Sequence, residues 1–60
     1  MNKMDMAIVD MGNNIVYHYS DQSIIPRVND VVLLKQKEFK VTCVIFDYDE
    51  REIKIIVHAL

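Results

Sequence analysis

The sequence contains only one cysteine, one glycine and one proline, and it has no long unbroken run of apolar residues. The single cysteine, Cys43, excludes a disulfide bond within these 60 residues and fits a reducing compartment, while leaving an intermolecular bridge open. The scarcity of glycine and proline disfavours long loops. Because Asp5 and Asp10 interrupt the apolar residues near the start, we expect neither a signal peptide nor a membrane span, and the cytoplasm is the default location.

The chain also lacks an excess of positive charge. Its formal net charge of −2 gives no electrostatic footprint for binding dominated by nucleic-acid phosphates, although a local basic patch remains open. Apolar residues make up 52% of the chain, which is typical of a folded domain rather than a disordered one. With no repeat or linker in 60 residues, we expect one small domain spanning 1–60 with a core of limited size.

Alternating apolar residues predict strands at both ends of the chain. Residues 39–46 and 53–57 are rich in Val, Ile and Phe, and the polar segment 47–51 between them has turn chemistry, so they are predicted to form a hairpin. Residues 6–9 and 15–19 are predicted to form another hairpin. Its turn, Gly12-Asn13-Asn14, contains residues that tolerate the positive φ angles of tight turns.

The segment 30–38 supports two interpretations. Asn29 could cap a short helix that begins with Asp30 and contains good helix formers up to Glu38. Against this, Val31 and Val32 are β-branched, and no glycine marks a helix end before Phe39. We therefore predict a turn over 27–30, a strand over 31–34 and a polar hairpin tip over 35–38, with a ββαββ arrangement as the alternative.

Five short strands in 60 residues predict an all-β protein, a strongly curved five-stranded sheet or small barrel. The pattern over 17–57 resembles the small Src-homology-three-like barrel proteins of bacteria and bacteriophages, whose role is unknown. The matching segments are Pro26, 29–33, 39–41, 46–49 and 53–57.

The resemblance implies a fold and a phage or prophage origin, and it implies no activity. In that family a Gly-Asp pair opens the central strand, whereas this chain has Asn29 before Asp30. Asparagine is the next most tolerant residue for a left-handed turn conformation, so this departure does not break the resemblance.

Residues able to carry chemistry do not form a recognisable catalytic or metal-binding motif. The carboxylates of residues 47–52 lack the spacing and glycine of a calcium loop, so we interpret them as a solvated turn in which Asp47 accepts hydrogen bonds from turn amides. His18, His58 and Cys43 are far apart in the sequence, and Cys43 is predicted to be a core residue. We expect no enzyme, no metal, no cofactor and no small-molecule substrate.

Both faces of the last hairpin carry large apolar residues, which is more than one solvated sheet face requires. The second face could be covered by the N-terminal segment, turned inward by strong strand bending, covered by another chain, or left exposed as a binding patch.

We therefore predict a non-enzymatic interaction protein that binds a protein partner or associates with itself, for example as a homodimer. The predicted interface residues are the outward apolar residues of the hairpin and three aromatic anchors: Val44, Phe46, Ile56, Tyr17, Tyr19 and Tyr48. The alternative is a single-stranded nucleic-acid binder that uses Tyr17, Tyr19, Arg27 and Lys40, which the net charge disfavours.

Overall fold

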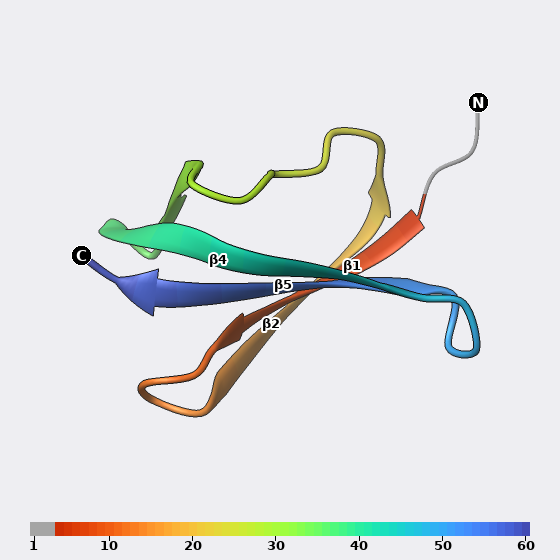
Figure 1. Cartoon of the computed structure of the whole chain (residues 1–60), viewed down its shortest axis with the longest axis horizontal. Coiled ribbons are helices and arrows are strands. Elements are labelled where there is room, and N and C mark those ends of the chain that lie inside the picture. Colours follow the sequence, from red (N-terminus) through yellow and green to blue (C-terminus); the bar gives the residue numbers. More distant parts are fainter. Residues whose placement is uncertain (1–3) are drawn as a thin grey trace.

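The computed structural model describes residues 4–60, without the side chain of Asp21, and these residues form a five-stranded sheet (Figure 1). The strands are β1 (Met4–Asp10), β2 (Ile15–Gln22), β3 (Val31–Leu34), β4 (Lys37–Asp47) and β5 (Glu52–Ala59). The predicted all-β class is confirmed, and the segment open to two interpretations is a strand rather than a helix.

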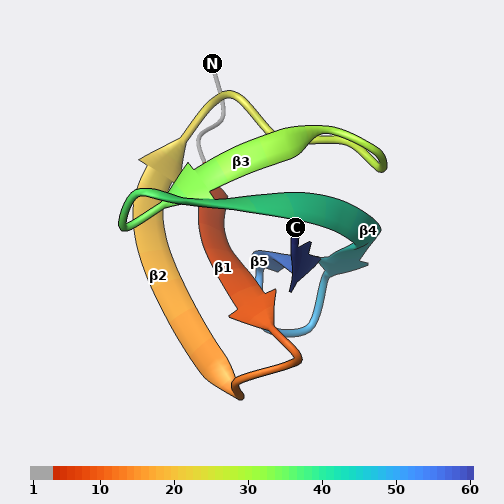
Figure 2. The same ribbon diagram turned by 90° about the vertical axis from the view of Figure 1, so that its left-hand side faces the viewer.

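The sheet has the strand order β2-β1-β5-β4-β3. All neighbours are antiparallel except β1 and β5, which are parallel and join the N-terminal hairpin to the three C-terminal strands. Figure 2 shows the sheet curling strongly, so that it forms a half-barrel with β2 and β3 as its two edges. The sheet therefore keeps two strands that each have one neighbour.

The turn between β3 and β4 is shorter than predicted. It contains only Lys35 and Gln36, with φ angles of 48° and 68°, and β4 begins at Lys37 rather than at Phe39. Two consecutive positive φ angles are the signature of the type I′ turn, whose twist matches that of the flanking strands. The polar hairpin tip over 35–38 was thus predicted two residues too long, because tertiary pairing overrides the poor turn propensity of lysine and glutamine.

Asparagine residues supply the left-handed conformations at two other turns. Asn29, in the turn predicted over 27–30, has φ of 78°, and its N–H donates to the Val41 carbonyl (2.9 Å). In the first hairpin Asn14 has φ of 54°, whereas Gly12 does not have a positive φ. The Gly12 N–H instead donates to the buried Asp10 carboxylate (3.1 Å). The positive φ expected at Gly12 therefore occurs two residues later, at Asn14.

The core lies on the concave side of the half-barrel. Its buried residues come from every strand except β2: Met6, Ile8, Leu34, Phe39, Val41, Ile53, Ile55 and Val57. Tyr17 of β2 and Ile25 of the following loop pack against this cluster. Burying a side chain of this size contributes roughly 1.5–3 kcal/mol, so the loss of even one such residue is a large fraction of the net stability of a small domain.

A β-bulge in β4 corrects the predicted orientation of that strand. The register to β5 shifts between Val41 and Cys43, so two residues on β4 occupy the place of one. After the bulge, Val44 packs against the core beside Ile55, whereas Cys43 is exposed. The predictions that Cys43 is a core residue and that Val44 points outward were therefore wrong. An inserted residue reverses every later side chain, and simple alternation cannot reveal it.

Candidate binding groove

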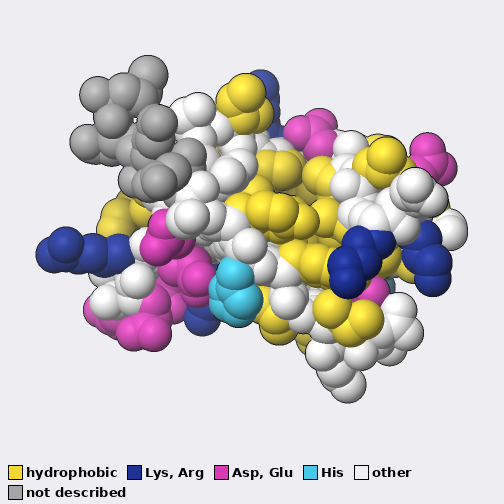
Figure 3. All heavy atoms as spheres, turned by 180° about the vertical axis from the view of Figure 1, so that it is seen from behind, with side chains coloured by type: hydrophobic (Ala, Val, Ile, Leu, Met, Phe, Trp, Pro, Cys, Tyr) yellow, Lys and Arg dark blue, Asp and Glu magenta, His cyan; other side chains and the backbone are white. Residues whose placement is uncertain are grey.

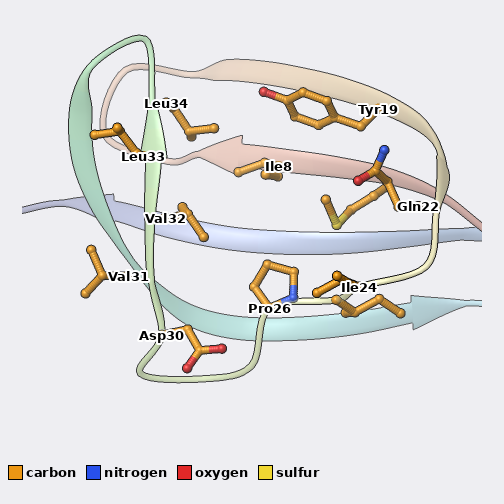
Figure 4. Close-up of a pocket in the computed structure, with 12 residues that line it drawn as sticks. Ile8, Tyr19, Gln22, Ile24, Pro26, Asp30, Val31, Val32, Leu33 and Leu34 are labelled. Atoms are coloured by element: carbon orange, nitrogen blue, oxygen red, sulfur yellow. The ribbon is translucent and has the colours of Figure 1, made fainter.

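A groove opens on the concave side between β2, β3 and the loop 23–30, and it has a volume of about 560 Å³ (Figure 4). This volume is in the range of ligand-binding pockets. The lining residues are Met6, Ile8, Tyr19, Gln22, Ile24, Ile25, Pro26, Asp30 and the four residues of β3. The groove is thus mainly apolar, with Gln22, Asp30 and the Tyr19 hydroxyl as its polar side-chain groups.

The side chains of β3 divide between the two sides of that strand. Figure 4 shows Val32 and Leu34 pointing into the groove, to the side of β3 on which Ile8 lies, while Val31 and Leu33 point away from it. Val31 and Leu33 are 56% and 67% exposed. The short edge strand therefore presents apolar side chains both to the groove and to the outside.

Among the residues that the structure describes, the backbone of β3 is paired on one side only. The Val41 N–H donates to the Asp30 carbonyl (2.9 Å). Hydrogen-bonded positions recur at every second residue of an antiparallel pair, so the backbone groups of Val32 and Leu34 also face β4. The Glu38 carbonyl, opposite Leu33, accepts instead from Leu60 N–H (3.0 Å) on the β5 side. The N–H and C=O groups of Val31 and Leu33 therefore face the free edge of β3.

A second, smaller groove lies across the loop from the first. It has a volume of about 430 Å³ and is lined by Ile25, Pro26, Arg27, Val28, Val44 and Phe46. Ile25 and Pro26 line both grooves, so the loop separates two connected apolar surfaces. The predicted interface residues Val44 and Phe46 thus face a groove on the concave side, because the bulge turns them inward.

The other predicted interface residues lie on different parts of the molecule. Tyr19 lines the first groove, and Tyr48 is 83% exposed in the turn between β4 and β5. Tyr17 is partly buried against the core, and the Lys35 ammonium lies 5.8 Å from its ring centroid. The structure therefore does not bring the three tyrosines together, and the Tyr17 ring is already covered by a cation of its own chain.

Ile56 belongs to an apolar stripe on the convex face. Val16 pairs with Val9, Val9 with Ile56, and Ile56 with Cys43, so these four residues cross four adjacent strands in one row. Val16 and Cys43 are exposed, while Val9 and Ile56 are partly buried. This row, the convex stripe, accounts for part of the apolar excess that the sequence shows on the last hairpin.

Acidic side chains gather at one end of the molecule, while lysine and arginine lie at both ends. Figure 3 shows most acidic side chains towards the turn between β4 and β5, lysine or arginine side chains at that end and at the opposite one, and hydrophobic side chains between them. Away from that turn, Lys35 and Lys37 belong to the hairpin of β3 and β4. Arg27 and Lys40 flank the start of β3, where Lys40 pairs with Val31. The cations proposed for nucleic-acid binding therefore surround β3 rather than the tyrosines of β2.

The acidic turn has an internal structural role. The Asp47 carboxylate accepts hydrogen bonds from the N–H groups of Asp49 and Glu50 (both 3.1 Å), which confirms the predicted turn role, and it pairs with the Lys54 ammonium (3.1 Å). The hydrogen bond from Glu50, together with Lys54, lowers the pKa of Asp47, and the hydrogen bond to Asp47 raises the pKa of Lys54.

Within the described part of the chain, no group of three histidine, cysteine, aspartate or glutamate side chains could hold a metal ion. His18 Nδ1 lies 3.7 Å from Glu52 Oε2. His18 is in β2, whereas Cys43 is in β4 and His58 is in β5. In residues 4–60 there is also no helix long and apolar enough to cross a membrane.

Sequence reasoning missed the principal groove residues Ile24, Val32 and Leu34. Their signal was the apolar pair before Pro26 and the four-residue apolar strand after it, but only the topology shows that this strand is an edge. No family model, curated protein or solved structure matches this chain. The resemblance to Src-homology-three-like barrels and the phage origin it implies remain predictions.

Proposed function

We propose that the protein is a non-enzymatic interaction module that holds an apolar segment of a partner protein in the groove between β2 and β3. The proposal rests on the groove, because its apolar floor adjoins apolar side chains that are largely exposed. Ile24 is 84% exposed at its rim, and Tyr19 lies across from it on β2. Aromatic and aliphatic groups in such a pocket are the usual anchors of a protein interface.

The charges around the groove specify the partner segment further. Lys35 directly follows Leu34 at one end of the groove, and Arg27 stands beyond Pro26 in the second groove. A segment with apolar anchors and flanking acidic residues would complement both the apolar floor and these cations. The single cysteine supports a reducing compartment such as the cytoplasm as the place where this binding occurs.

Selection of random peptides displayed on phage against the full chain tests the proposal. The selected peptides are then synthesised and titrated against the wild type, Ile24→Glu and the matched control Tyr48→Glu. Both substitutions replace an exposed apolar side chain by an acid, so neither alters the core. We expect Ile24→Glu to weaken binding at least about tenfold and Tyr48→Glu to leave it unchanged.

Equal binding to both variants, or no enriched peptide, would overturn the proposal. A polythymidine oligonucleotide titrated in parallel gives the alternative its own readout. Tight binding that weakens steeply with salt and is lost in Arg27→Ala with Lys40→Ala would replace the protein partner by single-stranded nucleic acid.

A further inference from the structure

The free edge of β3 is an unsatisfied pairing surface that the groove proposal does not use. Within residues 4–60, the N–H and C=O groups of Val31 and Leu33 have no partner strand, and the side chains of these two residues are among the more exposed large apolar ones. Natural sheets usually protect such an edge, because it pairs readily with another strand. Here the outward residues of the edge are valine and leucine rather than charges.

We propose that two copies of the chain pair through β3, antiparallel and related by a twofold axis at Val32, to form a continuous ten-stranded sheet from two five-stranded ones. In this register Val31 faces Leu33 of the second copy, and Leu33 faces Val31. The register places both free residues of each copy in hydrogen-bonded pairs. A twofold axis at Val31 or at Leu33 would instead pair only that one residue, with the same residue of the second copy.

The side chains agree with this register. The outward residues Val31 and Leu33 of the two copies would form one apolar cluster, removing from water side chains that are 56% and 67% exposed in the single chain. The two Val32 side chains would meet on the concave side, where β-branched cross-strand pairs are favourable. Val31, Val32 and Leu33 thereby each acquire an apolar neighbour.

The charges at the two ends of β3 also agree with it. Asp30 immediately precedes the strand and Lys35 immediately follows it. Antiparallel pairing about Val32 sets Leu34 opposite Asp30 of the second copy, which brings the Lys35 end of one strand to the Asp30 end of the other. On the outward face, each cross-strand row runs from Lys40 and Val31 of one copy to Leu33 and Glu38 of the other. Each row therefore has one positive and one negative end, and no like charges face each other.

A proline substitution tests the backbone pairing directly. The Leu33 N–H faces the free edge, so Leu33→Pro removes a donor to the second copy and no donor to β4. Sedimentation of the full chain across a wide concentration range should show a wild-type dimer and a Leu33→Pro monomer with an unchanged circular dichroism spectrum. Leu60→Lys, at another exposed leucine, should remain dimeric. A wild type that is monomeric throughout would overturn the proposal.

Cysteine cross-linking fixes the register even if Leu33→Pro fails to fold. On a Cys43→Ser background, Val32→Cys places two thiols on the twofold axis, in a non-hydrogen-bonded pair whose Cα atoms are about 4.5 Å apart, which is within disulfide range. Oxidised glutathione accepts the two electrons and two protons released as the thiols join.

We expect a covalent dimer from Val32→Cys and at least about tenfold less from Val31→Cys, because Val31 faces Leu33 rather than itself. Equal cross-linking at both positions would contradict the register. Neither readout uses the selected peptides, so the dimer and the partner-binding groove can fail separately.

Discussion

The concave and convex faces of this sheet are both apolar, but they differ in what surrounds the apolar side chains. On the convex stripe, Val9 and Ile56 sit on central strands whose backbone groups are paired on both sides. On the concave side, the groove ends at an edge strand with unpaired backbone groups and with residues such as Ile24 largely exposed. Apolar content alone therefore does not separate the two faces, and our proposals rest on its combination with the free backbone groups of an edge strand.

The sharpest contrast between the faces is the adjacent pair Ile55 and Ile56. Ile55 is fully buried on the concave side, so Ile55→Ala should lower the free energy of unfolding by about 2–5 kcal/mol. Ile56 is partly exposed on the convex stripe, and Ile56→Ala should cost less than about 1.5 kcal/mol. Urea denaturation of both variants measures the difference. Equal losses of unfolding free energy would mean that Ile56 is as well buried as Ile55 and that the convex stripe is covered.

The bulge predicts a smaller contrast between Val44 and Cys43. Val44→Ala should cost roughly 1 kcal/mol in urea denaturation, because Val44 packs against the core. Cys43→Ser should change stability by less than about 0.5 kcal/mol, because Cys43 is exposed. In the folded wild type its thiol should react with a thiol reagent as fast as in the urea-unfolded chain at the same pH. A thiol that is protected in the folded chain would mean that Cys43 is buried, as simple alternation predicts, and would contradict the bulge.

The rim of the concave face contains backbone strain that can be relieved. Gln36 has φ of 68° in the two-residue turn after β3, where glycine avoids the steric cost of a left-handed conformation. Gln36→Gly should raise the free energy of unfolding by about 1 kcal/mol, whereas Gln36→Ala should give no gain. Thermal unfolding of the two variants distinguishes relief of strain from loss of the glutamine side chain.

The smallest effect concerns the ion pair of Asp47 and Lys54, which β4 and β5 hold near the acidic turn. Because the pKa of Asp47 is lowered in the folded state, its contribution is present above the unfolded pKa and is lost as the pH falls through the folded value. The pKa of Lys54 is raised, so its contribution is lost only in strong alkali.

Stability should therefore fall below about pH 4, and Asp47→Asn should flatten that fall. Urea midpoints from about pH 5 to about pH 2 measure it, with Asp49→Asn as the control, since the Asp49 carboxylate has no hydrogen bond or ion pair in the described structure. An equal flattening in both variants would assign the fall to general charge repulsion.

The sequence by itself determined the strands, because alternation of β-branched and aromatic residues is a local pattern that favours an extended backbone. It also determined the turn that contains Asn29 and the hydrogen-bonding role of Asp47, which depend on neighbouring residues. These features require no knowledge of distant parts of the chain.

Tertiary structure alone decided which strands are edges, where β4 bulges and therefore which apolar residues face the groove. The parallel pairing of β1 with β5 leaves β2 and β3 unpaired on one side, and it joins segments more than forty residues apart, for example Met6 with Ile53. The bulge depends on fitting one long strand to its neighbour, and it reverses Cys43 and Val44 without any local signal. Surfaces made by such long-range pairing depend on the whole sheet, which no single stretch of residues encodes.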